Sequence, residues 1–495
     1  MKGEPAVIRS LPSGVPGLDT VLGGGLPEFS FNLIAGGPGS GKTTLAHQIM
    51  FANATVERPA LYFTVLGEPT LKMLRYQRQF SYFDPELAGS AIQFINLSAE
   101  VMERDLTEVL ARIVGEIERA KPGIVVVDSF RTIAGRRSSD GGNAFDLDQF
   151  VQRLALHLTT WEVTSFLLGE YVAEEQRSPV FTVADGILWL MQATDRNSVV
   201  RKLQVVKTRG RSPMPGLHTF RITDGGLQVF PRIPEQTRNR APQRRERLSI
   251  GVPGMDEMIG GGVIAGDAVM LTGPAGSGKS TIATQFMVAG LAKGDTGVIA
   301  VFEEYPEEYL ARANIRNPGI GKMIDDGKLL LIYLRPLDLS VDEALFAILE
   351  GVERLGAKRV VIDSLSGFEV ALAPTFREDF RESLYRLVGT LTATGVTVFM
   401  TAEVSESFSE ARFTTEKVSF ITDEIIVQRY IELEGALRRV MAVIKMRGSD
   451  HSHEFREYEV TAKGVVIGRT LKEYEGIITG VPKVRAKPIR AKRSK

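Results

Sequence analysis

The sequence predicts an α/β protein with two tandem domains of the same fold, each a mostly parallel sheet with helices on both faces. The chain has 495 residues, of which 43% are hydrophobic and 24% charged, so it is long enough for two globular domains with cores of their own. Blocks of sequence recur in one order, which indicates a duplicated domain. Short, nearly continuous apolar runs alternate with helical stretches, as in a parallel sheet buried on both faces.

The repeated blocks set the domain boundaries, because paired blocks stay 235 to 238 residues apart. In chain order the pairs are 13–19 and 250–256, 23–25 and 260–262, 36–43 and 273–280, 124–129 and 360–364, and 207–210 and 445–448. We therefore predict a first domain over 1–230, a basic linker over 231–247, a second domain over 248–480 and a basic, disordered tail over 481–495.

Four apolar runs in each copy are predicted to be buried strands. They are 31–35, 61–66, 124–127 and 165–168 in the first copy, and 269–272, 298–302, 360–362 and 397–400 in the second.

The pattern G-x-x-x-x-G-K-[ST] occurs once in each copy, after a predicted strand and before a predicted helix. In such a P-loop, backbone N–H groups and the helix N-terminus surround phosphates, the lysine reaches the β and γ phosphates, and the hydroxyl holds Mg²⁺. The pattern therefore predicts two sites for ATP and Mg²⁺, with Thr43 and Ser280 as Mg²⁺ ligands. The predicted ATP-binding residues of the two loops are Gly36, Gly37, Gly39, Ser40, Gly41, Lys42, Thr43 and Thr44, and Gly273, Gly276, Ser277, Gly278, Lys279, Ser280 and Thr281.

Carboxylates stand at the ends of several predicted strands. Asp128 and Asp363 each end an apolar run, where a carboxylate is well placed to hold Mg²⁺ through water; the alternative is a cap on the next helix. Glu170 and Glu403 follow another strand of each copy and could also face the phosphates.

Two adjacent glutamates, Glu303 and Glu304, follow the second strand of the second copy and could activate an attacking water or hydroxyl. Without the P-loops they would indicate a solvated turn. The first copy has Gly67 and Glu68 at the corresponding place, within one residue, so it keeps at most one of the two carboxylates. The predicted catalytic residues are thus Glu303, Glu304, Glu68, Lys279 and Lys42.

Composition excludes several other kinds of site. The chain has no cysteine, which excludes disulfides and thiolate metal sites and suits a reducing cytoplasm. Its five histidines have no ligand spacing, so no metal beyond Mg²⁺ is expected. Acidic and basic residues both number 60, which argues against a nucleic-acid coat. No signal peptide or apolar run of membrane length is present, so we expect a cytoplasmic protein without a membrane partner.

Several motifs together resemble the KaiC family, tandem RecA-like ATPases best known from the cyanobacterial circadian clock. They are the two P-loops, the Gly-Val-Pro-Gly openings at 14–17 and 251–254, Phe302-Glu303-Glu304 and the run 443–449. The resemblance covers about 11–480. It implies a two-tiered hexamer with ATP held between subunits, and it makes Glu303 and Glu304 the catalytic carboxylates of the second domain. The cations that it implies reach the neighbouring subunit's nucleotide are Lys207, Arg209, Lys445 and Arg447.

The chain departs from the clock proteins in three places. Ser419 matches the serine of their phosphorylated Ser-Thr pair, but Phe420 replaces the threonine. Single-site autophosphorylation on Ser419 is one interpretation, and an ordinary strand-edge serine is the other. Gly67 replaces the usual first glutamate of the first domain, which predicts slow or absent hydrolysis there. A basic tail from Val481 stands in place of the clock proteins' C-terminal segment.

We therefore expect a non-clock, KaiC-like ATPase that forms a signalling ring, is read by protein partners and has possible serine autokinase activity. One alternative is a RecA- or DnaB-like DNA-dependent ATPase, which only the basic linker and tail favour. The other is a nucleotide-gated scaffold without significant turnover, against which Glu303 and Glu304 argue.

Overall fold

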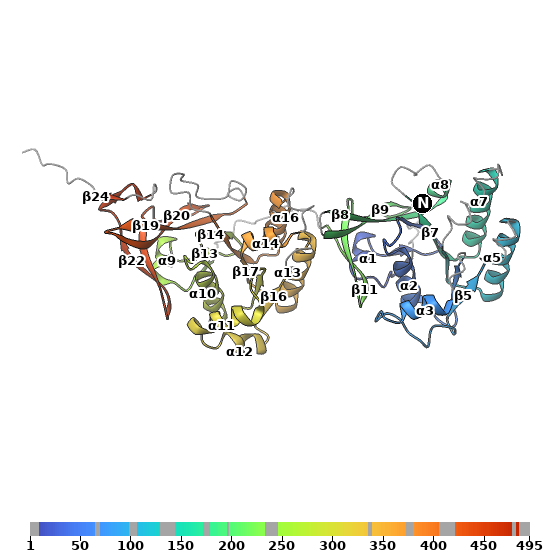
Figure 1. Ribbon diagram of the computed structural model, residues 1–495, viewed down its shortest axis with the longest axis horizontal. Coiled ribbons are helices and arrows are strands. Elements are labelled where there is room, and N and C mark those ends of the chain that lie inside the picture. The colour runs from blue at the N-terminus through green and yellow to red at the C-terminus, as the bar shows by residue number, and fades with distance from the viewer. Residues whose placement is uncertain are drawn as a thin grey trace, which may run out of the picture. The chain divides into compact units, whose positions relative to one another are not determined.

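The structure is a computed structural model. It describes residues 9–64, 70–98, 106–128, 144–171, 179–195, 198–232, 246–334, 339–372, 380–404, 421–477 and 482–484. The chain divides into two compact units, Met1–Arg232 and Ile233–Lys495, which are described one at a time below (Figure 1). Most of the predicted linker and tail lies outside the described residues.

The first unit is built on one nine-stranded sheet. Six parallel strands lie in the order β5 (Ile92–Asn96), β4 (Ala60–Thr64), β6 (Ile124–Asp128), β7 (Thr164–Glu170), β3 (Phe31–Gly36) and β8 (Gly186–Asp195). Antiparallel strands continue the sheet beyond β8 as β9 (Ser198–Thr208), β10 (His218–Thr223) and β11 (Gly226–Phe230). A separate short pair joins β1 (Ser10–Leu11) and β2 (Leu26–Pro27).

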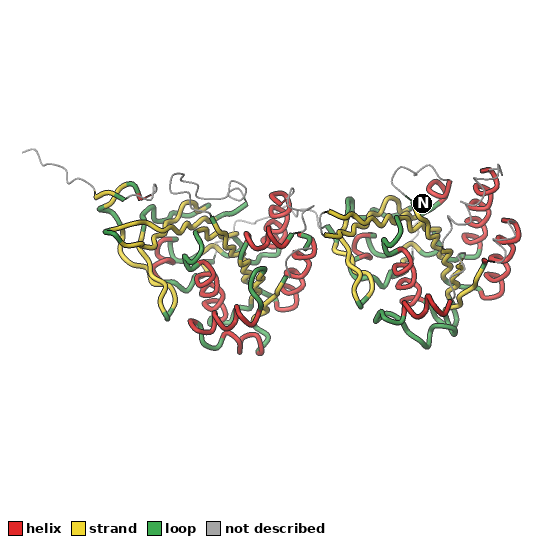
Figure 2. Tube along the Cα trace, in the orientation of Figure 1, coloured by secondary structure: helices red, strands yellow, loops and turns green. Residues whose placement is uncertain are grey.

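Helices cover both faces of this sheet (Figures 1 and 2). One face packs against α1 (Leu18–Val21), α2 (Lys42–Asn53) and α3 (Thr70–Gln77), and the other against α5 (Leu106–Ala120), α7 (Ala144–Thr160) and α8 (Pro179–Val183). Strand β3 shows why both faces are needed. Its Ile34 joins the core under α2, whereas Leu33 and Ala35 join the core under α5 and α7, because successive side chains of a strand point to opposite faces.

The second unit repeats this arrangement strand for strand. Its sheet runs β16 (Leu329–Tyr333), β15 (Gly297–Val301), β17 (Arg359–Asp363), β18 (Thr397–Glu403), β14 (Ala268–Gly273), β19 (Glu424–Leu433), β20 (Ala436–Met446), β21 (Arg456–Thr461) and β22 (Gly464–Thr470). Its helices are α9 (Pro253–Met258), α10 (Lys279–Leu291), α11 (Pro306–Arg316) and α12 (Ile320–Asp325) on one face, and α13 (Val341–Leu355), α14 (Leu365–Ala371) and α16 (Phe380–Ala393) on the other. Short pairs join β12 (Arg247–Leu248) to β13 (Val263–Ile264) and β23 (Tyr474–Glu475) to β24 (Lys483–Val484).

The predicted fold class is confirmed, since the described part of every predicted strand lies in the parallel portion of a sheet. The antiparallel strands that extend each sheet were not predicted individually. No helix of the described residues is long and apolar enough to cross a membrane.

Candidate functional site

Each P-loop joins the central parallel strand to a helix, β3 to α2 in the first unit and β14 to α10 in the second. The last glycine before each helix has a left-handed backbone, with φ of 100° at Gly41 and 97° at Gly278. A Cβ atom at either position would also lie 2.8 Å from the side chain of Ile222 or Val460, respectively. Glycine is therefore favoured at both positions by the backbone conformation and by the lack of space for a side chain. The helix N-terminus is left open to a ligand.

The P-loop lysines are buried and held by the loops themselves. Lys42 Nζ donates to the carbonyl oxygens of the first two loop residues at 3.0 and 2.8 Å, and Lys279 Nζ does so at 2.9 and 2.8 Å. Burial lowers the pKa of both lysines, and nearby carboxylates oppose this shift. Each ammonium group thus lies at the position from which a P-loop lysine reaches phosphate oxygens.

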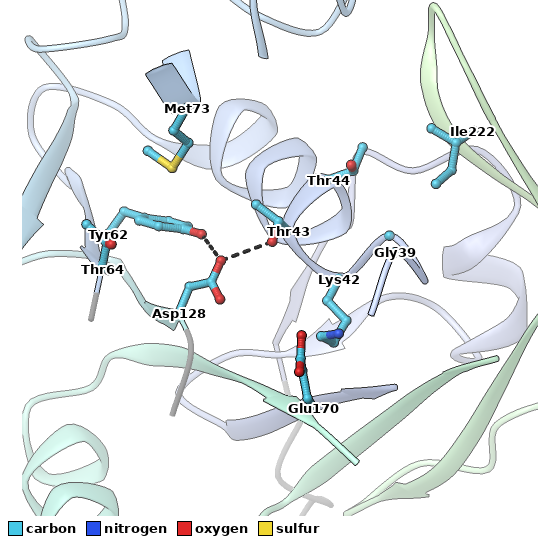
Figure 3. A pocket seen from close by; sticks show the side chains of 11 residues that line it. Gly39, Lys42, Thr43, Thr44, Tyr62, Thr64, Met73, Asp128, Glu170 and Ile222 are labelled. Carbon is cyan, nitrogen blue, oxygen red and sulfur yellow. Dashed lines mark hydrogen bonds between the residues drawn. The ribbon is translucent and has the colours of Figure 1, made fainter. Parts of the chain in front are cut away.

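The first unit has a cavity of about 390 Å³ beside its P-loop (Figure 3). Thr43 Oγ1 donates to Asp128 Oδ2 at 3.0 Å, and the Tyr62 hydroxyl donates to the same oxygen. Glu170 points toward Lys42 from the end of β7. The cavity is lined by Gly39, Gly41, Lys42, Thr43, Thr44, Tyr62, Thr64, Met73, Asp128, Glu170 and Ile222.

The donor set of this cavity fits Mg²⁺, which prefers hydroxyl and carboxylate oxygens and keeps several waters. Burial raises the pKa of Asp128, whereas the hydrogen bonds from Tyr62 and Thr43 and the charge of Lys42 lower it. These contacts hold one carboxylate oxygen toward the P-loop hydroxyl, the pair of groups that positions the metal in P-loop proteins.

The second unit assembles the same groups from equivalent elements. Asp363 ends β17, accepts a hydrogen bond from Thr401 Oγ1 at 2.6 Å, and is hydrogen-bonded by Ser280. Burial raises the pKa of Asp363, and these hydrogen bonds lower it. Glu403 ends β18 and favours the charged form of Lys279. Each P-loop hydroxyl therefore lies beside the strand-end aspartate of its own unit.

The other predicted loop residues take supporting positions. The side chains of Ser40 and Ser277 are buried beneath their loops, and Ser277 Oγ donates to Gln428 Oε1 at 2.9 Å. Thr44 lines the first cavity, and Thr281 lies in the first turn of α10.

The two adjacent glutamates of the second unit differ in their contacts. Glu303 Oε1 accepts a hydrogen bond from Ser364 Oγ at 2.7 Å, and its charge acts on the pKa of both Lys279 and Asp363. Glu304 forms a bidentate pair with Arg312 of α11, at 3.1 Å from Nε and 2.5 Å from Nη2. Glu303 is therefore one of three carboxylates whose charge acts on the P-loop lysine, with Glu403 and Asp363, whereas Glu304 is tied to a helix.

Strand register relates these glutamates to the first unit. Thr64 pairs with Asp128, as Val301 pairs with Asp363. The segment 65–69 that follows β4 lies outside the described residues. The correspondence of Gly67 and Glu68 to the two glutamates, and the catalytic role of Glu68, therefore stay predictions.

Comparison with known proteins gives the family. A family model described as "ATPase: KaiC" matches the chain twice, over residues 11–233 and 248–472. This chain belongs to the KaiC family. It is 27% identical over 488 residues to the circadian clock oscillator protein KaiC of Rippkaea orientalis, covering 96% of this chain and 92% of that protein. It is also 27% identical over 489 residues to the circadian clock protein KaiC3 of a Synechocystis species, covering 96% and 95%.

Tyr62 is a site residue that the sequence analysis of this KaiC-family chain missed. It is the one aromatic residue with a hydroxyl in β4, and Ile299 takes its register position in β15. Its ring stacks on buried His47 at 4.6 Å between centroids, and burial lowers the pKa of His47 to about 3. In the second unit a tyrosine from a helix, Tyr309 of α11, lies near Asp363 instead. Its hydroxyl is 2.9 Å from Thr284 Oγ1. A tyrosine within a mostly apolar strand is the sequence signal that could have indicated Tyr62.

The cations that the KaiC resemblance assigns to a neighbouring subunit's nucleotide lie at the amino ends of the parallel strands of their own unit. Lys207 pairs in register with Ile187 near the start of β8, and Arg209 bonds Asp185 just before that strand at 2.9 Å. The P-loop follows the opposite, carboxyl end of the parallel strands. Lys445 and Arg447 lie equivalently in the second unit, where Lys445 Nζ donates to Thr422 O at 2.6 Å and Arg447 lies 3.6 Å from Asp423.

Proposed function

We propose that this chain is an ATP-hydrolysing ring protein in which the second unit turns over ATP and the first unit holds ATP as a structural ligand. One observation carries the division between the units. Glu303 lies beside Lys279 and Asp363 in the second unit, whereas the first unit has Gly67 and Glu68 at the corresponding place of its sequence, within one residue, and keeps at most one of the two carboxylates.

The groups of the second unit have complementary tasks in phosphoryl transfer. Lys279 offsets phosphate charge from within the P-loop, and Ser280 with Asp363 holds the metal. Mg²⁺, when bound, neutralises charge that develops on the phosphate oxygens. Glu303 orients the attacking water and accepts its proton, and the hydrogen bond from Ser364 fixes the carboxylate for this task.

The edge position of the four cations supports a ring. Lys207, Arg209, Lys445 and Arg447 lie at the sheet edge opposite the P-loop of their own unit, so a nucleotide that they contact belongs to another subunit. Such cations would act as an arginine finger does when it is supplied in trans. We propose a two-tiered hexamer with ATP between subunits, as the KaiC resemblance implies.

The output of this ring is proposed to be signalling through protein partners that read its nucleotide or phosphate state. Ser419 is the proposed single site of autophosphorylation, and it lies outside the described residues. Because Phe420 follows it, a two-site phosphorylation cycle is not proposed.

Paired lysine variants test the division between the units. Lys279→Ala should remove most ATP turnover while hexamers persist, and Lys42→Ala should mainly disperse the hexamer. The measurements are ADP release and the mass of the assembly in Mg-ATP. If Lys42→Ala abolished hydrolysis and left the hexamer whole, the division of labour would be wrong.

The mass of the intact chain after incubation with Mg-ATP tests the phosphorylation proposal. One added phosphate that is absent in both Ser419→Ala and Glu303→Gln is the expected result. Steady ADP release with no added mass would leave an ATPase whose signal is the bound nucleotide alone.

A further inference from the structure

Three non-glycine residues of the first unit have a left-handed backbone conformation, which residues with a side chain rarely adopt. These are Phe29 with φ of 60°, Lys121 with φ of 48° and Glu162 with φ of 54°. They precede β3, β6 and β7, at the amino ends of the parallel strands and therefore at the opposite sheet edge from the P-loop. Left-handed, non-glycine residues persist where the surrounding structure holds them, often at functional sites.

The second unit has glycine at all three of these positions. Gly266, Gly356 and Gly395 precede β14, β17 and β18 by the same number of residues, with φ of 78°, 56° and 89°. Hydrogen bonds confirm the equivalence. The backbone N–H of Phe29 donates to Thr164 Oγ1 at 2.9 Å, and that of Gly266 donates to Thr397 Oγ1 at 2.8 Å. The fold thus accepts the unstrained residue at each position, yet the first unit has a large side chain there.

The three strained residues line one cavity of about 540 Å³, a size typical of small-molecule sites. Three cations, two aromatic rings and two carboxylates surround it. The Arg58 guanidinium lies 5.9 Å from the centre of the Phe29 ring. The full lining is Arg9, Phe29, Arg58, Ile117, Glu118, Lys121, Pro122, Trp161, Glu162 and Val163.

The cations of this cavity are available to an anion. Within the described part of the chain, no carboxylate forms a salt bridge with Arg9, Arg58 or Lys121. All three side chains are exposed, whereas the Trp161 ring is half-buried and stacks on His157 at 5.3 Å between centroids. Charged groups therefore stand around a partly sheltered aromatic surface.

The second unit keeps one carboxylate, Glu353 in place of Glu118, but differs at three further lining positions. Glu246 replaces Arg9, Asp295 replaces Arg58 and Thr394 replaces Trp161. Asp295 is moreover engaged by Lys358 at 3.0 Å and by the buried Arg359 at 3.2 Å. An acidic residue thus replaces a basic one at two of these positions, and the charge of Asp295 is neutralised by Lys358 and Arg359. The combination of exposed cations and aromatic rings is therefore specific to the first unit.

We propose that the cavity of the first unit binds a purine nucleoside monophosphate, at a site separate from both P-loops. The cations match a phosphate group, with which arginine forms bidentate, charge-assisted hydrogen bonds. Trp161 and Phe29 offer faces on which a base stacks. Glu118 and Glu162 can accept hydrogen bonds from the N–H groups of a purine edge. The same two carboxylates repel a continuous phosphate backbone, which favours a small ligand over a polynucleotide.

Binding is tested on the full chain with both P-loops saturated by Mg-ATPγS. GMP and AMP are the probes, and the measurements are equilibrium dialysis and tryptophan fluorescence. Trp161 should be quenched by a stacked base, whereas Trp189, the other tryptophan, is buried in the core. Saturable quenching by at least one probe, lost in Trp161→Phe, is the expected result.

Substitutions that introduce the second unit's residue at a lining position test which side chains bind the ligand. Arg58→Asp should weaken binding at least tenfold, since it removes a charge-assisted contact. Lys121→Gly should also weaken binding but raise the melting temperature by about 2–4 °C, because it relieves the left-handed strain. If Lys121 had only a structural role, Lys121→Gly would change the melting temperature without weakening ligand binding. Gly356→Lys is the matched control, which should lower the melting temperature of the second unit and create no site.

Three outcomes would overturn the proposal. Neither probe binds at concentrations up to about 1 mM. Alternatively, binding persists unchanged in Arg58→Asp. Finally, a short oligodeoxythymidine binds in an Arg58-dependent manner and the mononucleotides do not, which would make this edge a nucleic-acid surface.

Discussion

Gly367 offers a way to displace Glu303 without altering any charged residue. It lies in the first turn of α14, against the Glu303 side chain, and its N–H donates to Ser364 Oγ at 3.0 Å. A Cβ atom at this position would lie 2.4 Å from Glu303 Oε1 and 2.6 Å from its Cγ, whereas ordinary contacts begin at 3.4 Å. In Gly367→Ala the carboxylate must therefore move by about 1 Å.

The expected loss of turnover follows from that displacement. A misplacement of about 1 Å in a catalytic arrangement can reduce the rate about 100-fold, and removal of a general base costs on the order of 100- to 10,000-fold. We expect Gly367→Ala to reduce the kcat of ATP hydrolysis about 100-fold. ATP affinity should change little, because the P-loop and Lys279 are untouched.

Steady-state ADP release and equilibrium binding of ATP measure the two effects. Gly321→Ala in α12 is the matched control, because its Cβ would meet no atom within 4 Å. Alanine favours a helix over glycine, so neither change should unfold the chain, and circular dichroism checks this. If Gly367→Ala kept the turnover of the control, Glu303 would not be the base.

Three further variants test the surroundings of the sites. Tyr62→Phe should weaken Mg²⁺-dependent ATP binding by the first unit about tenfold, since Asp128 loses one hydrogen bond to its charged form; Mg²⁺ titration in a Lys279→Ala background measures this, and an unchanged midpoint would contradict it. Glu304→Gln should reduce turnover less than about tenfold, because this carboxylate is engaged by Arg312. Burial raises the pKa of Glu424 from 4.5 to about 7, so its ionisation destabilises the fold increasingly as pH rises from 4.5 to 7. Glu424→Gln should therefore stabilise the second unit at pH 8 by about 3 kcal/mol and have little effect at pH 4.5, measured by urea unfolding; equal effects at both pH values would contradict the origin in ionisation.

The two units show how one fold supports different sites. Glu303 accepts a hydrogen bond from Ser364, the N-cap residue of α14, in the second unit, whereas Tyr62 donates to Asp128 in the first. The strained Phe29, Lys121 and Glu162 likewise occur only in the first. Glu303 and the three strained residues lie next to strand ends, where a side chain can change without disturbing the sheet, whereas Tyr62 lies within β4.

Short-range sequence patterns determined much of this protein. The two P-loops, the aspartates at strand ends beside the P-loop hydroxyls and the parallel strands were all predicted from local sequence, because a buried parallel strand is continuously apolar and a P-loop needs glycine at fixed positions. The nearly constant spacing between repeated blocks predicted that the chain contains a duplicated domain. These features depend on the conformation of a few adjacent residues, which the local sequence specifies.

The tertiary structure decided what depends on contacts between distant segments. Only the pairing of β4 with β6 brought Tyr62 to Asp128, and only packing separated Glu303, held by Ser364, from Glu304, held by Arg312. The cavity around Lys121 is formed by chain segments spread over residues 9–163, and none of them carries a recognisable motif by itself. Such sites depend on which distant segments the fold brings into contact, and a short stretch of sequence does not specify its distant partners.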